Sequence, residues 1–61
     1  MTALCLVILN YIKDHDGQTI LAKDIETDTH ITGKTIRKNV KFLVENGYIR
    51  KDGKKYFVLN R

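Results

Sequence analysis

The dipeptide Asp52-Gly53 constrains the fold of this chain more than any other feature, because two short runs of β-prone residues flank it. Both central residues of a type I′ hairpin turn need positive φ, and Asp-Gly is a preferred pair at those positions. The sequence therefore predicts a two-stranded hairpin over residues 48–59, with Asp52-Gly53 as its loop. The cross-strand pairs expected from that loop are Lys51–Lys54, Arg50–Lys55 and Ile49–Tyr56.

The first of three helical segments extends from Thr2, a suitable N-cap, to about residue 15. Its expected core-facing stripe consists of Leu4, Ile8, Tyr11 and Ile12. Further apolar residues make this face wider than one neighbouring layer needs. Either the helix is therefore the central element of a small core, or part of it packs against a second copy of the chain. The residues expected at such a homodimer contact are Cys5, Leu6, Leu9, Phe42 and Val44.

The middle of the chain predicts a short strand at 18–20 and a second helix at 21–28. A third helix is expected from Thr32, its N-cap, to about Asn46. Its buried stripe follows from three apolar residues at helical spacing, Ile36, Val40 and Leu43. Gly47 suits the left-handed position that ends a helix.

With 61 residues the chain forms one domain, residues 1–61, near the lower size limit for folding without help. Its single cysteine excludes an intramolecular disulfide and is typical of a reducing compartment. The apolar run at residues 3–9 is too short for a membrane span and lacks the basic flank of a signal peptide. We expect a soluble, intracellular protein of the cytoplasm, associated with the nucleoid and not with a membrane, and the initial Met favours a complete chain.

The formal net charge of +4 is divided unevenly along the chain. Residues 1–31 carry two basic and five acidic side chains, whereas residues 32–61 carry nine basic and two acidic ones. A strongly basic half is the electrostatic footprint of a phosphate binder, and an unevenly charged but merely solvated surface is the alternative. The sequence contains no metal-ligand spacing, glycine-rich phosphate loop or catalytic arrangement. We therefore expect no enzyme, metal, cofactor or small-molecule substrate.

The order of helix, short strand, helix, tight turn, helix and hairpin carries apolar and hydroxyl residues at a characteristic spacing. They are Ile20, Ile25, Ile31-Thr32, Thr35-Ile36-x-x-x-Val40-x-x-Leu43 and Gly47-Tyr48-Ile49. In these residues the chain resembles the winged helix-turn-helix family of DNA-binding domains, over almost its whole length. The resemblance implies an α+β, mainly α fold, with three helices and a C-terminal two-stranded hairpin. Two positions depart from the family pattern. Family members often have an apolar residue where this chain has Thr29, and glycine where it has His30.

The basic residues of the third helix lie away from its apolar stripe. A helix fits the major groove of B-DNA, and the residues near its N-terminus reach the base edges first. Arg37 is suited to bidentate contact with guanine, and the amides at the helix start can hold a phosphate. The residues of this helix expected to contact DNA are Thr32, Lys34, Thr35, Arg37, Lys38 and Lys41.

The wing, residues 50–55, adds four cations, Arg50, Lys51, Lys54 and Lys55. The expected register opposes like charges, at a cost of a few tenths of a kcal/mol per pair that an anionic partner would offset. Protection of the strand edge against aggregation is a compatible alternative. We predict a small transcriptional regulator that binds double-stranded DNA, with residues 32–46 in the major groove and the wing on the backbone. A winged-helix protein–protein interaction module and an RNA- or ribosome-associated basic protein are the other interpretations.

Overall fold

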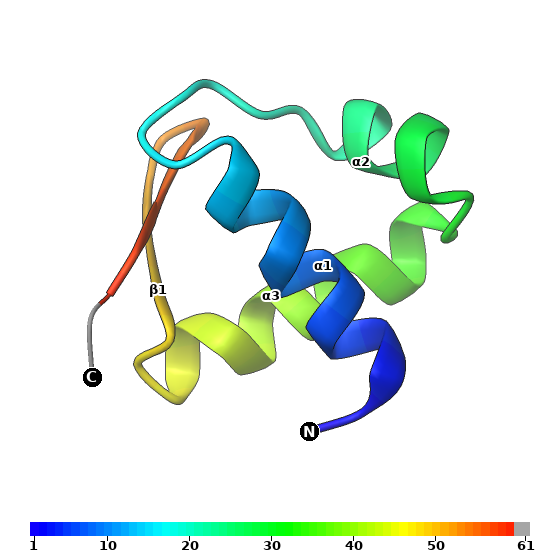
Figure 1. The fold of residues 1–61 in the computed structure, drawn as a ribbon, viewed down its shortest axis with the longest axis horizontal. Coiled ribbons are helices and arrows are strands. Elements are labelled where there is room, and N and C mark those ends of the chain that lie inside the picture. The colour runs from blue at the N-terminus through cyan, green and yellow to red at the C-terminus, as the bar shows by residue number, and fades with distance from the viewer. Residues whose placement is uncertain (60–61) are drawn as a thin grey trace.

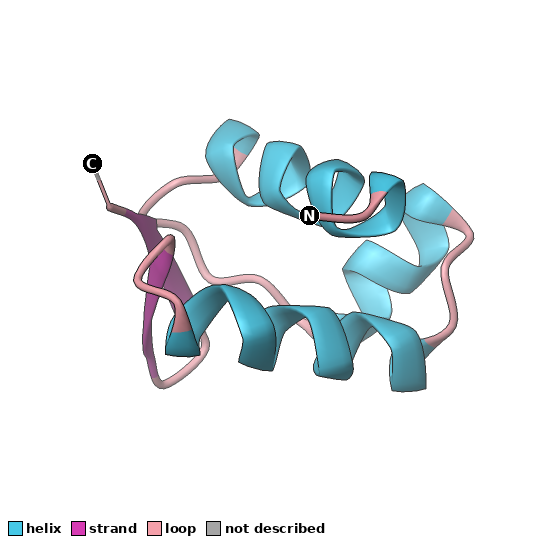
Figure 2. Cartoon of the chain, turned by 90° about the horizontal axis from the view of Figure 1, so that it is seen from below, coloured by secondary structure: helices cyan, strands magenta, loops and turns pink. Residues whose placement is uncertain are grey.

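The computed structural model describes residues 1–59, which form three helices followed by a two-stranded antiparallel sheet. In chain order the elements are α1 (Ala3–Asp14), α2 (Ala22–Thr29), α3 (Gly33–Glu45), β1 (Ile49–Asp52) and β2 (Lys55–Val58). Helix α1 lies over α3, and the hairpin stands beside one end of this pair (Figures 1 and 2). The α+β, mainly α arrangement confirms the predicted fold class and has the layout of a winged helix. Within residues 1–59, every helix falls short of the length and apolar character of a bilayer span.

The core-facing side of α1 consists of four buried side chains, Cys5, Ile8, Leu9 and Ile12. These positions recur at the spacing of one helix face. Thr2 caps the helix as predicted, because its Oγ1 accepts a hydrogen bond from the N–H of Cys5 at 3.2 Å. The prediction that Leu4 faces the core is wrong, since its side chain is 47% exposed. Leu4 lies about 100° around the helix from Cys5, outside the face that α3 and α2 cover.

Two residues expected at a homodimer contact lie instead in the protein's own core. Cys5 is 2% exposed and Leu9 is 7% exposed, and both belong to the cluster of buried apolar side chains. That part of the sequence-based prediction is wrong, because a side chain packed inside its own subunit has no surface to offer a second one. Burial also raises the pKa of the Cys5 thiol above its usual value.

The second and third helices are joined by a tight turn at His30 to Thr32. His30 has φ 59°, so the chain adopts there the left-handed conformation that glycine takes most easily. This explains why the resemblance leads one to expect glycine at that position. Ile31, the next residue, is buried and anchors the turn in the core.

Helix α3 packs through the stripe that its periodicity predicted, with Ile36, Val40 and Leu43 buried. Its end forms a Schellman motif around Gly47, which has φ 75°. The N–H of Gly47 donates to the carbonyl of Val44 at 3.1 Å, and the N–H of Tyr48 donates to the carbonyl of Leu43 at 2.9 Å. These bonds fix the direction in which the chain leaves α3 for the hairpin.

The hairpin forms where predicted, but its register differs by two residues. The observed pairs are Ile49–Val58, Arg50–Phe57, Lys51–Tyr56 and Asp52–Lys55. Gly53 and Lys54 are therefore the loop residues, and of the two only Gly53 has positive φ, at 62°. Glycine at the first loop position is the requirement of a type II′ turn. The predicted opposition of like charges is thus wrong, because the structure sets Asp52 opposite Lys55 and places two other cations opposite aromatic rings.

Residues 16–20 run beside the outer edge of β2. The N–H of Gly17 donates to the carbonyl of Tyr56 at 2.8 Å, and the N–H of Ile20 donates to the carbonyl of Lys54 at 2.8 Å. The expected strand at 18–20 is reduced to one isolated bridge, which joins Thr19 to Lys55. This segment occupies hydrogen-bonding groups of an otherwise open strand edge.

A polar contact ties α1 to α2. The Tyr11 hydroxyl donates a hydrogen bond to Asp28 Oδ2 at 2.7 Å, and the Tyr11 ring stacks on His15 with centroids 4.3 Å apart. The hydrogen bond to Asp28 is the main cause that raises the pKa of Tyr11 to about 12, with burial next. Deprotonation of Tyr11 would place two negative charges side by side, so the contact depends on the protonated phenol.

Candidate nucleic-acid interface

The outward face of α3 carries four exposed cations, Lys34, Arg37, Lys38 and Lys41. They project from the side opposite the buried stripe, because they fall at i, i+3, i+4 and i+7 on one helix. Within residues 1–59, none of these four side chains makes an ion pair or a hydrogen bond with the rest of the protein. The structure thus presents the row of free cations that the periodicity predicted.

The start of α3 is arranged differently from the prediction. Thr32 occupies the N-cap position, but its side chain makes no capping bond to a backbone amide. Its hydroxyl donates instead to the Thr35 hydroxyl at 3.1 Å. A carboxylate oxygen of Glu26 approaches the first residue of the helix, 3.2 Å from the position that a Cβ on Gly33 would take. An anion therefore already lies in the field of the helix N-terminus, where the sequence had suggested a phosphate.

The hairpin divides its cations between two faces. Lys51 and Lys54 line a groove of about 550 Å³ that they share with Arg37 and Lys41 of α3. Cations from two elements thus line one hollow. The sequence could place each group on its own element but could not show that they meet.

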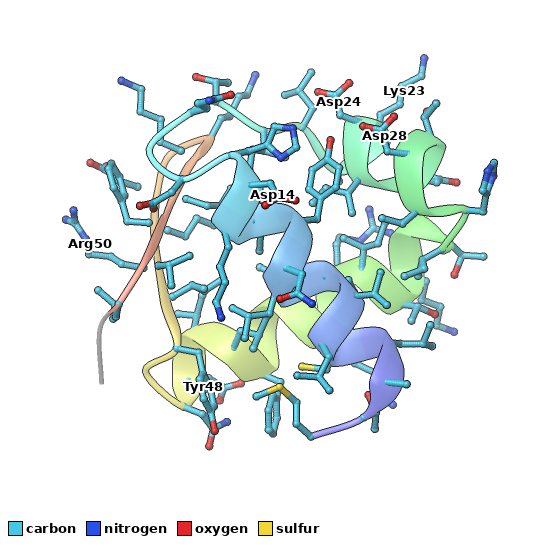
Figure 3. All side chains as sticks on the ribbon, viewed as in Figure 1. Asp14, Lys23, Asp24, Asp28, Tyr48 and Arg50 are labelled. Atoms are coloured by element: carbon cyan, nitrogen blue, oxygen red, sulfur yellow. The ribbon has the colours of Figure 1, made fainter. Side chains whose placement is uncertain are left out.

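Arg50 and Lys55 lie on the other face of the hairpin, because neighbouring strand residues point to opposite sides. The Arg50 guanidinium lies 4.7 Å from the centroid of the Phe57 ring, a cation–π contact. Figure 3 shows Arg50 pointing away from the helices. Of the four wing cations predicted to contact DNA, the structure brings two to α3 and turns two away from it.

Acidic side chains gather on α1 and α2, away from the outward face of α3. Figure 3 shows Asp14 near the end of α1, and Asp24 and Asp28 on α2. Because α1 covers the opposite side of α3, these three carboxylates lie away from the α3 cations, whereas Glu26 lies beside the start of α3.

The residues expected at a homodimer contact do not form one patch. Phe42 and Val44 are both exposed on α3. Because they are two positions apart in the sequence, their side chains point in directions about 200° apart around the helix axis. Val44 lines the groove beside the hairpin, whereas Phe42 lines a smaller hollow of about 280 Å³ next to Met1. Leu6 is exposed on α1. Self-association therefore stays a prediction, with Leu6 and Phe42 as its available members.

The floor of the groove is the feature that sequence reasoning missed. Leu21, Ala22 and Val44 contribute to it from α3 and from the start of α2. Val44 follows Val40 by four residues, so it extends the buried stripe towards the surface. That spacing was the sequence signal for an apolar groove floor, but the same spacing is also compatible with a contact to another chain.

No protein-family model, curated protein or solved structure matches the chain. Within residues 1–59, no group of three or more His, Cys, Asp or Glu side chains is arranged to hold a metal ion.

Proposed function

We propose that this protein is a winged helix-turn-helix protein that binds double-stranded DNA in a sequence-specific manner and acts as a small transcriptional regulator. The observation that carries the proposal is the row of four exposed cations on the outward face of α3, whose side chains have no ion-pair or hydrogen-bond partner among residues 1–59. A helix of about 10–12 Å diameter fits the major groove of B-DNA, which is about 12 Å wide. A module that binds only proteins has no need for four adjacent like charges, which repel one another by a few tenths of a kcal/mol per pair.

The residues of α3 take different roles according to their position along the helix. Lys34, Arg37 and Lys38 lie in the N-terminal half, which enters the groove first, so they contact base edges and the groove wall. Arg37 is the side chain suited to paired hydrogen bonds with guanine. Lys41, further along, contacts the phosphate backbone. Thr32 and Thr35 form the edge of this surface through their hydroxyl groups.

The wing supplies backbone contacts mainly through Lys51 and Lys54, which border the same groove as Arg37 and Lys41. Arg50 and Lys55, on the other face of the hairpin, contribute less. The carboxylate of Glu26 beside the start of α3 disfavours a phosphate there, so side chains carry most of the electrostatic attraction.

Self-association would set the symmetry of the DNA site. The exposed residues available for it are Leu6 of α1 and Phe42 of α3. Two copies of α3 related by a two-fold axis would bind half-sites about one helical turn apart. A regulator of this kind acts on the nucleoid, in the cytoplasm.

The test is the double substitution Arg37→Ala and Lys38→Ala, measured by fluorescence anisotropy with short duplexes selected from a random pool. Loss of two cations and one base contact should weaken binding by about 10- to 100-fold. The matched control is Lys13→Ala with Lys23→Ala, which removes two exposed cations from α1 and α2. Circular dichroism should be unchanged in both variants. Equal binding by the parent and the Arg37/Lys38 variant would contradict the proposal.

A further inference from the structure

The groove between α3 and the hairpin has an apolar floor that a phosphate backbone does not require. Phosphates are bound by cations and amide groups, and apolar side chains offer them nothing. The solvent-exposed side chains of this floor are Leu21 and Val44, which are 44% and 39% exposed. The floor consists of Ile20, Leu21, Ile36, Val40, Val44 and Tyr56.

The rim of this groove is strongly cationic. Arg37 and Lys41 approach it from α3, and Lys51 and Lys54 approach it from the hairpin, whereas Glu45 is the one acidic residue that lines it among residues 1–59. The groove thus combines an apolar floor with cations on two sides. Such a site is complementary to a molecule that has an apolar body and one negative charge.

We propose that this groove binds a small organic acid, a molecule with a largely apolar body and one carboxylate group. The apolar body lies on the floor between α3 and the hairpin, and the carboxylate accepts charge-assisted hydrogen bonds from the rim. The volume of about 550 Å³ lies within the range of small-molecule sites, about 300–1,000 Å³. The acid is a ligand and not a substrate, since the groove contributes binding groups alone.

An acidic amphipathic peptide is the competing occupant, because it offers the same combination of charges and apolar groups. A helix bound in a groove needs apolar anchors over about two turns, at positions i, i+4 and i+7. Of the floor residues only Leu21 and Val44 are exposed, whereas the other four are at most 8% exposed, so the accessible apolar surface is too short for three such anchors. The structure therefore favours the small acid.

One consequence rests on the function proposed above. The four rim cations are also those assigned to DNA, so an acid in the groove and a DNA backbone would compete for them. Binding of the acid would then release DNA, and the protein would need no separate sensor domain.

The experiment is a titration of the isotope-labelled chain with 6-phenylhexanoate, followed by methyl and amide chemical shifts. Signals of Ile20 and Val44 should shift and saturate with a dissociation constant on the order of 1 mM, as expected for a ligand of this size. The matched neutral compound, 6-phenylhexan-1-ol, should bind about tenfold more weakly because it lacks the charge.

The variant Val44→Glu should lower the affinity for the acid at least about tenfold, since it brings a second carboxylate into the groove. Its matched control is Val7→Glu, the same substitution at a residue of α1 that is 45% exposed and lies outside the groove. The control should bind like the parent. If Val44→Glu fails to fold, the comparison of the acid with the alcohol decides alone.

Equal affinity for the acid and the alcohol would overturn the proposal, as would shifts confined to the hollow beside Met1 and Phe42. A response to an acidic amphipathic peptide without any response to 6-phenylhexanoate would overturn it in favour of a protein partner. Competition is measured separately, by release of a labelled duplex on addition of 6-phenylhexanoate with equal acetate as the ionic control. Failure of DNA binding leaves the titration intact, so the two proposals fail independently.

Discussion

The two faces of the hairpin offer a matched test of the proposed contact with DNA. Lys51 and Lys54 border the groove that Arg37 and Lys41 share, whereas Arg50 and Lys55 point to the other side of the sheet. Each pair can be replaced by alanine, and each replacement removes two positive charges from the same small element. Net charge changes equally, so any difference between the two variants reports position alone.

The expected magnitude follows from the number of cations on the α3 side of the molecule. Five phosphate contacts at about −0.9 each give a slope of about −4.5 in a plot of log affinity against log salt. These cations are Lys34, Lys38, Lys41, Lys51 and Lys54, because Arg37 is assigned to guanine. Without Lys51 and Lys54 the slope should fall to about −2.7. Between about 50 and 200 mM salt, the parent should lose about 500-fold in affinity and this variant about 40-fold.

The assay is fluorescence anisotropy with one duplex at several salt concentrations, with circular dichroism as the check on folding. The Arg50→Ala and Lys55→Ala variant should keep a slope near −4.5, because the two charges that it removes lie off the proposed contact surface. Equal slopes for the two variants would refute this account of the wing. A change in preferred sequence without a change in slope would instead show that the wing reads bases.

Three further predictions concern stability and the start of α3. Tyr11→Phe should lower the free energy of unfolding by about 0.5–1.5 kcal/mol at neutral pH. Because the pKa of Tyr11 is raised from 10.0 to about 12 in the folded state, this contribution is fully present below pH 10 and is lost as pH rises towards 12. Urea titrations of both proteins at several pH values should therefore converge at high pH; a constant difference would speak against the hydrogen bond to Asp28. Glu26→Gln should tighten DNA binding about threefold, because a charge beside the start of α3 no longer repels phosphate, and anisotropy measures this; unchanged affinity would place DNA elsewhere. Gly47→Ala should destabilise the protein by about 1–2 kcal/mol, since alanine must adopt φ 75°, and a thermal melt without a shift would contradict that reasoning.

The sequence predicted the helices and their buried stripes where one periodicity dominated. In α3 the apolar residues leave a single choice, and Ile36, Val40 and Leu43 are buried as expected. In α1 nearly every residue from 3 to 9 is apolar, so periodicity could not decide between Leu4 and Cys5. Which of the two residues is buried depends on how α1 packs against α3 and α2. A local sequence pattern contains no information about that packing.

The hairpin register shows a second limit. A slip by one residue would turn every side chain to the other face, but a slip by two residues leaves the faces unchanged. The predicted and observed registers differ by two, so Ile49, Tyr56 and Val58 share one face in both. The two registers differ only in the geometry of the turn and in which charged residues lie opposite each other on the two strands. The observed register sets Asp52 opposite Lys55 and removes the opposition of like charges, which favours it energetically.

The candidate site was predictable as a list of residues and not as a surface. Helical spacing sufficed to place Lys34, Arg37, Lys38 and Lys41 on one face. It could not show which hairpin cations join them, because that depends on how β1 leaves the Schellman motif at Gly47. Nor could it show the position of Glu26 beside the start of α3, which arises from the packing of α2.

The central claim is that duplex DNA contacts α3 and the groove-facing side of the hairpin. A titration of the isotope-labelled protein with a selected duplex, followed by amide chemical shifts at low salt, tests it most directly. The largest shifts should fall between Gly33 and Lys41 and between Lys51 and Lys54, with residues 10–14 and 22–28 unaffected. Shifts centred on the acidic side of α1 and α2, or no shifts with any duplex, would contradict it.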